Sequence, residues 1–371
     1  MKNSMCQSEG IWMNYRNERY TFSLAGPEHS HQLLEIYESG EFTGNISVLY
    51  TRRPDPFQSL MMEGESALIP IVFDREKNRV CAMGACIIRK VNLNGEIRTA
   101  GYLTGLKSLP EYRKRIPHGS EVYRYLYEQT KDKVDIYYTT ILQDNVVAQK
   151  MLEKKRRNMP EYRYSGRYTV YCISTGPAQR RKERGREYNK YRFLKGNIAE
   201  VERFFQNASP RFNLSPVEMN WPGLTDEDCY TLRDSDGRII AACALWSQQS
   251  YKQYLITEYR GIYRYLRKVP LELFGYPNLP KENQPVNYTS VTMLAVSDDD
   301  SKIATYFIEK VAEAAKSYDF AMLGLFENHP LTASVAGIRS IKYESRLYTV
   351  HWNDDSLIPD DKPVDLEVGL L

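Results

Sequence analysis

A basic loop that leads into a helix is the part of this sequence whose residue types best suit a phosphorylated ligand. Arg113, Lys114 and Arg115 occupy the loop, and Gly119 and Ser120 open a segment whose apolar residues recur with helical spacing. The N–H groups and positive dipole end of such a helix favour a diphosphate, to which guanidinium groups donate charge-assisted hydrogen bonds. The alternative interpretation is a solvated turn that only caps the helix.

The elements on either side of the loop would hold it in place. Residues 97–106 are rich in apolar and β-branched side chains and predict a strand. Pro110, which follows the strand, forces a loop. Residues 134–142 predict a short buried strand, and a second helix begins at Asn145 with Ala148 on its apolar side. Strand, basic loop, helix, strand and helix therefore follow one another without interruption.

This succession resembles the GNAT acetyltransferase superfamily, whose members have a strand that ends in a splayed bulge, a pyrophosphate-binding loop, and an Asn-x-x-Ala helix along the pantetheine arm. The resemblance implies a mixed α+β fold and an acyl-CoA co-substrate, acetyl-CoA or another, without a metal. The cofactor-binding residues that it implies are Leu106, Lys107 and Ser108 at the strand end, Arg113, Lys114, Arg115, His118, Gly119 and Ser120 in the loop, and Asn145 and Ala148 in the later helix.

Two positions depart from the family pattern. The first loop glycine corresponds to Ile116 or Pro117, although Gly119 can restore a close approach of the main chain. The tyrosine that serves many members as general acid corresponds to Leu152. The catalytic acid and base are therefore unknown from the sequence; the residues of suitable type near these segments are Glu111, Tyr112, His118 and Tyr138.

The remaining elements of the first half come in the order that the family shows. The sequence predicts strands at 20–25, 66–73 and 79–91 and a helix at 30–37. Family members shape the acceptor pocket with the loop near the first helices, which makes Arg52, Arg53 and Asp55 candidates for contacts with the acceptor. A surface cluster of ion pairs is the alternative.

The chain also repeats itself. Residues 133–145 are echoed by 317–328, and residues 168–171 by 348–351, in the same order and at nearly the same offset. Such self-similarity indicates two copies of one αβ unit. The second copy has Asp298, Asp299 and Asp300 where the first has its basic loop, and carboxylates would repel a diphosphate.

We therefore expect two tandem GNAT-like domains, each a twisted, mostly antiparallel sheet flanked by helices. The expected division is an acyl-CoA-binding domain at 1–175, a basic linker at 176–190, a degenerate second domain at 191–353 and a C-terminal tail at 354–371. The length of 371 residues suits two domains.

The amino-acid composition indicates which classes of partner and which cellular compartment suit the chain. With 50 Lys and Arg against 47 Asp and Glu, the chain lacks the strongly basic balance of a nucleic-acid binder. Six cysteines without a Cys-x-x-Cys pair favour buried thiols in a reducing compartment, and the five histidines show no zinc pattern. No apolar run approaches the roughly 20 residues of a membrane span. We expect a cytoplasmic protein with a small-molecule amine as partner and no membrane partner; its oligomeric state stays open.

The resemblance implies direct attack of an amine on a thioester, whose carbonyl oxygen would accept a hydrogen bond from the main-chain N–H of Leu106 or Lys107. An acyl-CoA-dependent N-acyltransferase is thus the leading hypothesis. One alternative is a non-catalytic protein that binds or senses acyl-CoA, which Leu152 and the missing loop glycine favour. Another is an aminoacyl-tRNA-dependent transferase of the peptidoglycan-bridge type, supported only by the basic linker.

Overall fold

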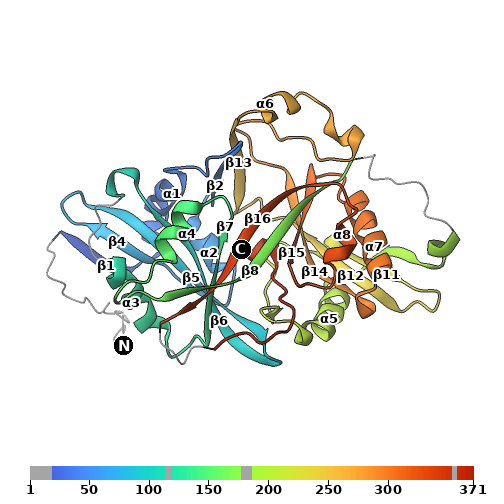
Figure 1. Ribbon diagram of the computed structural model, residues 1–371, viewed down its shortest axis with the longest axis horizontal. Helices are drawn as coiled ribbons and strands as arrows, with labels where there is room; N and C mark the ends of the chain where they lie inside the picture. The colour runs from blue at the N-terminus through green and yellow to red at the C-terminus, as the bar shows by residue number, and fades with distance from the viewer. Residues whose placement is uncertain (1–18, 114–118, 177–185, 353–356) are drawn as a thin grey trace, which may run out of the picture.

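The computed structural model describes residues 19–113, 119–176, 186–352 and 357–371. Within them, fourteen strands form one continuous mixed sheet with helices against its faces, and two further strands pair separately (Figure 1). The order along the main path of the sheet is β1-β4-β5-β6-β7-β16-β8-β15-β14-β12-β11-β9.

The first half of the chain supplies one end of the sheet. Its strands are β1 (Tyr20–Leu24), β2 (Ile46–Thr51), β3 (Ser66–Leu68), β4 (Pro70–Asp74), β5 (Arg79–Leu93), β6 (Glu96–Ser108) and β7 (Ile136–Leu142). Its helices are α1 (Ser30–Glu38), α2 (Pro56–Met61), α3 (Gly119–Thr130) and α4 (Val146–Leu152).

The second half supplies the other end. The strand β8 (Glu161–Ser174) ends the first half of the sequence. The strands of the second half are β9 (Arg192–Lys195), β10 (Pro216–Val217), β11 (Cys229–Arg233), β12 (Ile239–Trp246), β13 (Gln253–Tyr259), β14 (Tyr288–Val296), β15 (Phe320–Phe326) and β16 (Ser340–His351). Its helices are α5 (Ile198–Ala208), α6 (Tyr263–Leu266), α7 (Ser301–Ala314) and α8 (Thr332–Val335), and a short 3-10 helix, η9, covers Val368–Leu370.

Local sequence explains the first helices. In α1 the buried side chains are Leu33, Ile36 and Tyr37, whose spacing places them on one face, against β5. Helix α2 begins at Pro56, which tolerates a first helical position, and the side chain of Asp55 accepts a hydrogen bond from an N–H in its first turn.

The two halves repeat one arrangement. In the first, β5 pairs with β6 antiparallel, and β6 pairs with β7 in parallel across α3. In the second, β12 pairs with β14 antiparallel, and β14 pairs with β15 in parallel across α7. Two copies of one unit are thus visible in the topology.

The halves exchange their last strands. β16, from the end of the chain, pairs with β7 of the first half, while β8 pairs with β15 of the second half, and β8 and β16 also pair with each other. β2 and β13 form the separate two-stranded sheet, which joins the halves a second time. The domain boundaries expected from the sequence stay a prediction, because strands cross between the two units in space.

One core therefore spans both halves. Its largest cluster of buried apolar side chains includes Ile36 and Ile87 from the first half and Tyr288 and Met322 from the second. The five cysteines of the described ranges are buried and unpaired. Over the same ranges, no helix has the length and apolar character needed to cross a bilayer, and no group of three or more His, Cys, Asp or Glu side chains suits a metal ion.

Candidate functional site

An opening forms in the sheet where β6 and β7 diverge. Their parallel pairing runs from Ala100 with Ile136 to Tyr102 with Tyr138, and both strands then continue without further pairing to each other. Side chains bridge the gap at its narrow end: Thr139 Oγ1 donates to the main-chain oxygen of Leu103 at 2.6 Å. The hydroxyl of Tyr102 lies 2.9 Å from Thr140 Oγ1. The peptide groups further along the two strands can thus contact a ligand.

A β-bulge stands at the edge of this opening. The register of β6 against β5 shifts so that Gly105 and Leu106 together face the single residue Gly84. Gly105 has φ +64°, and a Cβ at this position would lie 2.9 Å from the hydroxyl oxygen of Tyr37. A bulge leaves the peptide groups of its extra residue outside the ladder. Leu106 is 53% exposed, so the bulge lies at the surface of the protein.

The side chain of Lys107 faces away from the opening, toward α1. Its ammonium group donates to the main-chain oxygen of Gly40 at 2.7 Å and also to that of Tyr37. Burial, together with the nearby guanidinium group of Arg113, lowers the pKa of Lys107 to about 8. Lys107 can therefore contribute its main chain to the bulge, while Ser108 is half-buried and pairs with Ala82.

The basic loop is described in part. Arg113 is exposed and lies beside Gly40, since a Cβ on that glycine would come within 3.0 Å of its guanidinium nitrogen. Helix α3 begins at Gly119, so Ser120 lies inside its first turn. The predicted contacts of Lys114, Arg115 and His118 fall outside the described residues.

Helix α4 lies beside the far strand of the opening. Asn145 caps it, because its side-chain oxygen accepts from the N–H of Ala148 at 3.1 Å. The amide of Gln149 donates to the main-chain oxygens of Leu142 and Gln143, each at 2.9 Å, and so ties the helix to the end of β7. The structure thus gives Asn145 a capping role and leaves Ala148 half-buried.

The outer side of α4 is apolar. Val147 is 80% exposed, and Val146 and Met151 are also exposed. These side chains, and Leu106 at the end of β6, are exposed apolar groups of the kind that an alkyl chain of a ligand would cover. Leu152, at the family's tyrosine position, is half-buried against the apolar cluster beside α3.

The second half has the same bulge, but it is occupied. In β14 the register shift places Met293 and Leu294 opposite Cys243, and Met293 has φ +52°. The N–H of Met293 donates to a carboxyl oxygen of Glu367 at 2.7 Å, and Thr292 Oγ1 donates to the other at 2.8 Å. A side chain from the end of the sequence therefore fills the place that is exposed in β6.

In the acidic loop before α7, the carboxylates of Asp299 and Asp300 are paired with other groups of the protein. Asp300 accepts hydrogen bonds from the N–H groups of Lys302 and Ile303, at 2.8 and 3.0 Å. Asp299 forms a bidentate ion pair with Arg211, at 2.6 and 2.7 Å. This loop caps the helix and has the wrong charge for a phosphate.

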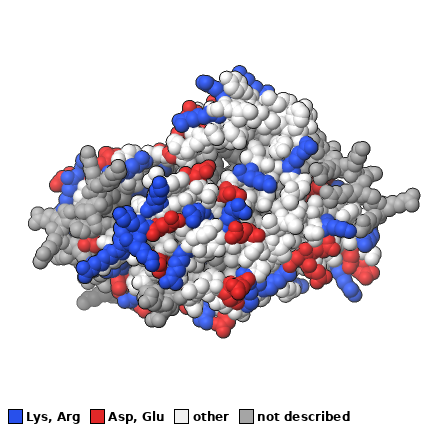
Figure 2. Space-filling model, in the orientation of Figure 1, with Lys and Arg blue, Asp and Glu red and all other residues white. Residues whose placement is uncertain are grey.

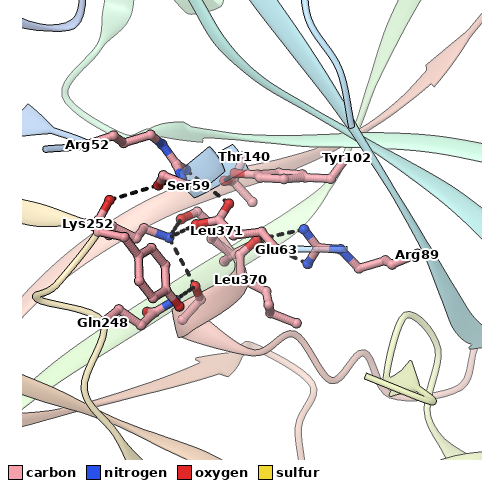
Figure 3. A network of polar contacts seen from close by, with 12 residues as sticks. Arg52, Ser59, Glu63, Arg89, Tyr102, Thr140, Gln248, Lys252, Leu370 and Leu371 are labelled. Carbon is pink, nitrogen blue, oxygen red and sulfur yellow. Dashed lines mark hydrogen bonds and ion pairs between the residues drawn. The ribbon is translucent and has the colours of Figure 1, made fainter. Parts of the chain in front are cut away.

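A buried group of charged residues, here called the central polar cluster, lies between the halves (Figure 3). It consists of Arg52, Glu63, Arg89 and Lys252, none more than 2% exposed, around the main-chain oxygens of residues 369–371. Glu63 accepts from Arg52 at 3.0 Å and from Lys252 at 2.9 Å. Lys252 also donates to the oxygens of Gly369 and Leu371, and Arg89 donates to that of Leu370.

Burial shapes the charges of this cluster. Burial alone would raise the pKa of Glu63, but the adjacent Arg52 and Lys252 lower it to about 2. Burial lowers the pKa of Lys252 to about 8. Its three hydrogen bonds engage all three ammonium donors, so the cluster anchors the end of the sequence under the opening. Arg89 also lies 5.4 Å from the ring of Tyr102, at the narrow end.

The sequence missed most of this cluster. The prediction of a surface cluster of ion pairs is wrong for Arg52, because this side chain is buried. The prediction fits Arg53, whose exposed side chain pairs with Glu38 at 2.6 Å. The side chain of Asp55 instead caps α2. Glu63 and Lys252 are 189 residues apart in the chain, and no local pattern marks either one.

No protein-family model matches the chain, and no curated protein shows significant sequence similarity to it. Solved structures do resemble it. Over 94% of its length it is similar to 90% of Saccharomyces cerevisiae N-myristoyltransferase with bound myristoyl-CoA, with a TM-score of 0.55 and 10% sequence identity.

Two further structures are GCN5-related N-acetyltransferases. The one from Anabaena variabilis has a TM-score of 0.52 and 10% identity, over 90% of this chain and 73% of that one. The one from Sphaerobacter thermophilus has a TM-score of 0.50 and 12% identity, over 91% of this chain and 96% of that one. At these identities the comparison establishes the fold, and it confirms the mixed α+β architecture with two GNAT-like units in tandem.

Proposed function

We propose that this tandem GNAT-fold protein is an N-acyltransferase that transfers an acetyl or other acyl group from acyl-CoA to the amine of a small or amino-acid-like acceptor. The observation that carries the proposal is the bulge at Gly105 and Leu106, at the edge of the opening between β6 and β7. The equivalent bulge of the second half is filled by Glu367. One acyl-CoA site per chain, in the first half, follows from this contrast.

The cofactor would lie across the opening. Its pantetheine arm would run between the bulge and the apolar side of α4, where Leu106, Val147 and Met151 offer exposed apolar surface. Its diphosphate would meet the guanidinium group of Arg113 and the N-terminal turn of α3, which begins at Gly119. The similar structures include an N-myristoyltransferase with bound myristoyl-CoA and a GCN5-related N-acetyltransferase, which supports an acyl-CoA co-substrate.

The proposed reaction is a direct transfer. A neutral amine attacks the thioester carbon, the tetrahedral intermediate collapses, and the carbon–sulfur bond breaks to leave the amide and the CoA thiolate. The nitrogen loses a proton and the thiolate gains one. The main-chain N–H of Leu106 or Lys107 would donate to the oxyanion. The central polar cluster would position the segment 369–371 beneath the reacting groups, by way of Lys252 and Arg89.

Two further proposals concern the division of the chain into units and its localisation. The units would span 1–175 and 191–353, with their last strands exchanged as β8 and β16. The five buried thiols support the cytoplasmic localisation.

Leu152 supports a second candidate. Because this residue stands at the position of the family's usual acid, a protein that binds acyl-CoA without turnover is the alternative.

Calorimetry with CoA and a thiol-release assay test the proposal together. We expect one CoA bound per chain, and thiol release from acetyl-CoA or a longer acyl-CoA with at least one member of an amine library. Binding without release from any acyl-CoA would support the non-catalytic alternative. Two equivalent sites, or no binding at millimolar CoA, would refute the assignment of the site.

A further inference from the structure

A segment between β13 and β14 projects from the body of the molecule. It covers residues 260–283, here called the protruding segment, and contains α6 and a 3-10 helix at Leu271–Phe274. Figure 1 shows it at the top of the view, beyond the two-stranded sheet of β2 and β13. The opening between β6 and β7 involves none of its residues, so the proposed acyl-CoA site does not explain it.

The protruding segment exposes large apolar side chains. Tyr265 is 72% exposed, Ile262 and Leu273 are each 65% exposed, and Phe274 is 56% exposed. Val269 and Tyr276 extend the same surface. Apolar side chains gathered in this way mark an interaction site, since a solvated loop gains nothing from exposing them.

The segment is also basic. Residues 260–283 contain five Lys and Arg against two Glu, an excess of three positive charges that equals the formal net charge of the whole chain, +3. Arg264 and Lys268 are exposed beside Tyr265 and Val269. Figure 2 shows Lys and Arg side chains beside uncharged surface in this part of the molecule. A partner must therefore be apolar at its contact and negatively charged around it.

We propose that the protruding segment binds the surface of an anionic lipid bilayer. Its apolar side chains would enter the headgroup region, and its Lys and Arg side chains would contact the lipid phosphates and carboxylates. Half of the six exposed side chains, namely Ile262, Val269 and Leu273, are aliphatic and could not stack on nucleic-acid bases, whereas all six could enter the headgroup region, which favours lipid over RNA. The expectation of no membrane partner came from the absence of a long apolar run, which tests spanning and not surface binding.

Vesicle co-sedimentation of the full chain tests the proposal. The vesicles contain phosphatidylcholine alone or phosphatidylcholine mixed with phosphatidylserine, at physiological and at high salt. The wild-type protein should sediment with the mixed vesicles and much less with the neutral ones, and high salt should weaken the binding. Leu273→Ser with Phe274→Ser should reduce binding at least about tenfold, since the lost burial of the two side chains exceeds the about 1.4 kcal/mol of one decade.

Matched variants show whether the effects on vesicle binding are specific to the protruding segment or follow from any loss of exposed apolar surface or positive charge. Ile97→Ser with Leu194→Ser removes two exposed apolar side chains elsewhere and should leave binding unchanged. Arg264→Glu with Lys268→Glu should abolish the preference for anionic vesicles. Arg203→Glu with Lys316→Glu, which makes the same charge change on exposed positions of the second half, should not.

Three results would overturn the proposal. One is no binding of the wild-type protein to mixed vesicles, and another is equal loss in the patch and control variants. The third is a change in self-association or RNA binding in the patch variants while vesicle binding stays the same. Thermal melting of each variant shows that it is folded, and none of these readouts depends on acyl transfer.

Discussion

Replacing Glu367 with glutamine should remove a pH-dependent loss of stability that this side chain causes between about pH 6.5 and about pH 8. Burial, reinforced by the nearby carboxyl of Asp365, raises the pKa of Glu367 to about 8 in the folded protein. Between its ordinary value and this raised value, the folded state holds a proton that the unfolded state lacks. The stabilisation is therefore complete at low pH and is lost as the pH rises through about 8.

The contribution of Glu367 changes most clearly in a window from about pH 6.5 to about pH 8. The pKa of His329 is lowered to about 4, but in the unfolded state a histidine titrates near its ordinary value of about 6.5, so His329 adds a small opposite slope at the acid edge of the window. Burial lowers the pKa of both Lys107 and Lys252 to about 8, so these groups begin to lose protons inside the window and add stability as the pH rises. The contribution of Glu367 alone should fall across the window by roughly 1.5 kcal/mol, and the comparison of the wild-type protein with Glu367→Gln separates it from the opposing groups.

Urea denaturation followed by tryptophan fluorescence measures this change, and Trp246 is a local probe because its ring lies against Gly369. The Glu367→Gln variant keeps a side-chain oxygen for the N–H of Met293 and carries no proton that titrates, so its free energy of unfolding should lack this fall and should rise slightly across the window. Glu227→Gln, at a side chain 88% exposed, should keep the wild-type slope. The same slope in the wild-type protein and in Glu367→Gln would contradict the reasoning.

Three further predictions concern the first half and its dependence on the second. Gly105→Ala should weaken CoA binding in calorimetry more than Gly237→Ala, because both have positive φ but only Gly105 has a neighbour within 4 Å of the added methyl group; equal effects would show that the bulge is not at the site. Arg113→Glu should reduce CoA affinity at least about tenfold, since it removes charge-assisted hydrogen bonds worth roughly 1.5 to 3 kcal/mol, whereas Arg203→Glu should not; equal binding by both variants at native melting temperature would remove Arg113 from the site. Residues 1–175 expressed alone should be insoluble or poorly protected in hydrogen exchange, because β7 and β8 would both lose β16; a soluble, fully protected fragment would show that the second half is dispensable for folding.

Local patterns in the sequence predicted the elements around the opening well. The strand expected at 97–106 is β6, the helix expected after the basic loop is α3, and Asn145 begins α4. These features depend on strand propensity, helical spacing and capping, which involve residues close together in the chain. The internal repeat likewise predicted two units, because each copy preserves its own local pattern.

Other features of the site depend on residues that meet only in the folded chain. The side chain of Lys107 belongs to the expected cofactor site by position, yet it bonds to main-chain oxygens at the end of α1. Arg52 has the sequence context of a surface loop, yet it is buried with Glu63 and Lys252. A buried charged side chain must form hydrogen bonds or ion pairs, because burying it without a partner costs free energy. Which partner is within reach depends on the packing of segments that are distant in the sequence.

The sequence by itself determined that the chain holds two repeated units, with a basic loop in the first and an acidic loop in the second. From this contrast it predicted that the first copy binds a diphosphate. Only the tertiary structure decided that β8 and β16 are exchanged and that Glu367 fills the second bulge. Strand pairing at this range leaves no periodic trace in the chain, because a strand satisfies its own hydrogen bonds equally well beside either neighbour. The choice between neighbours is made by the single core that both halves bury together.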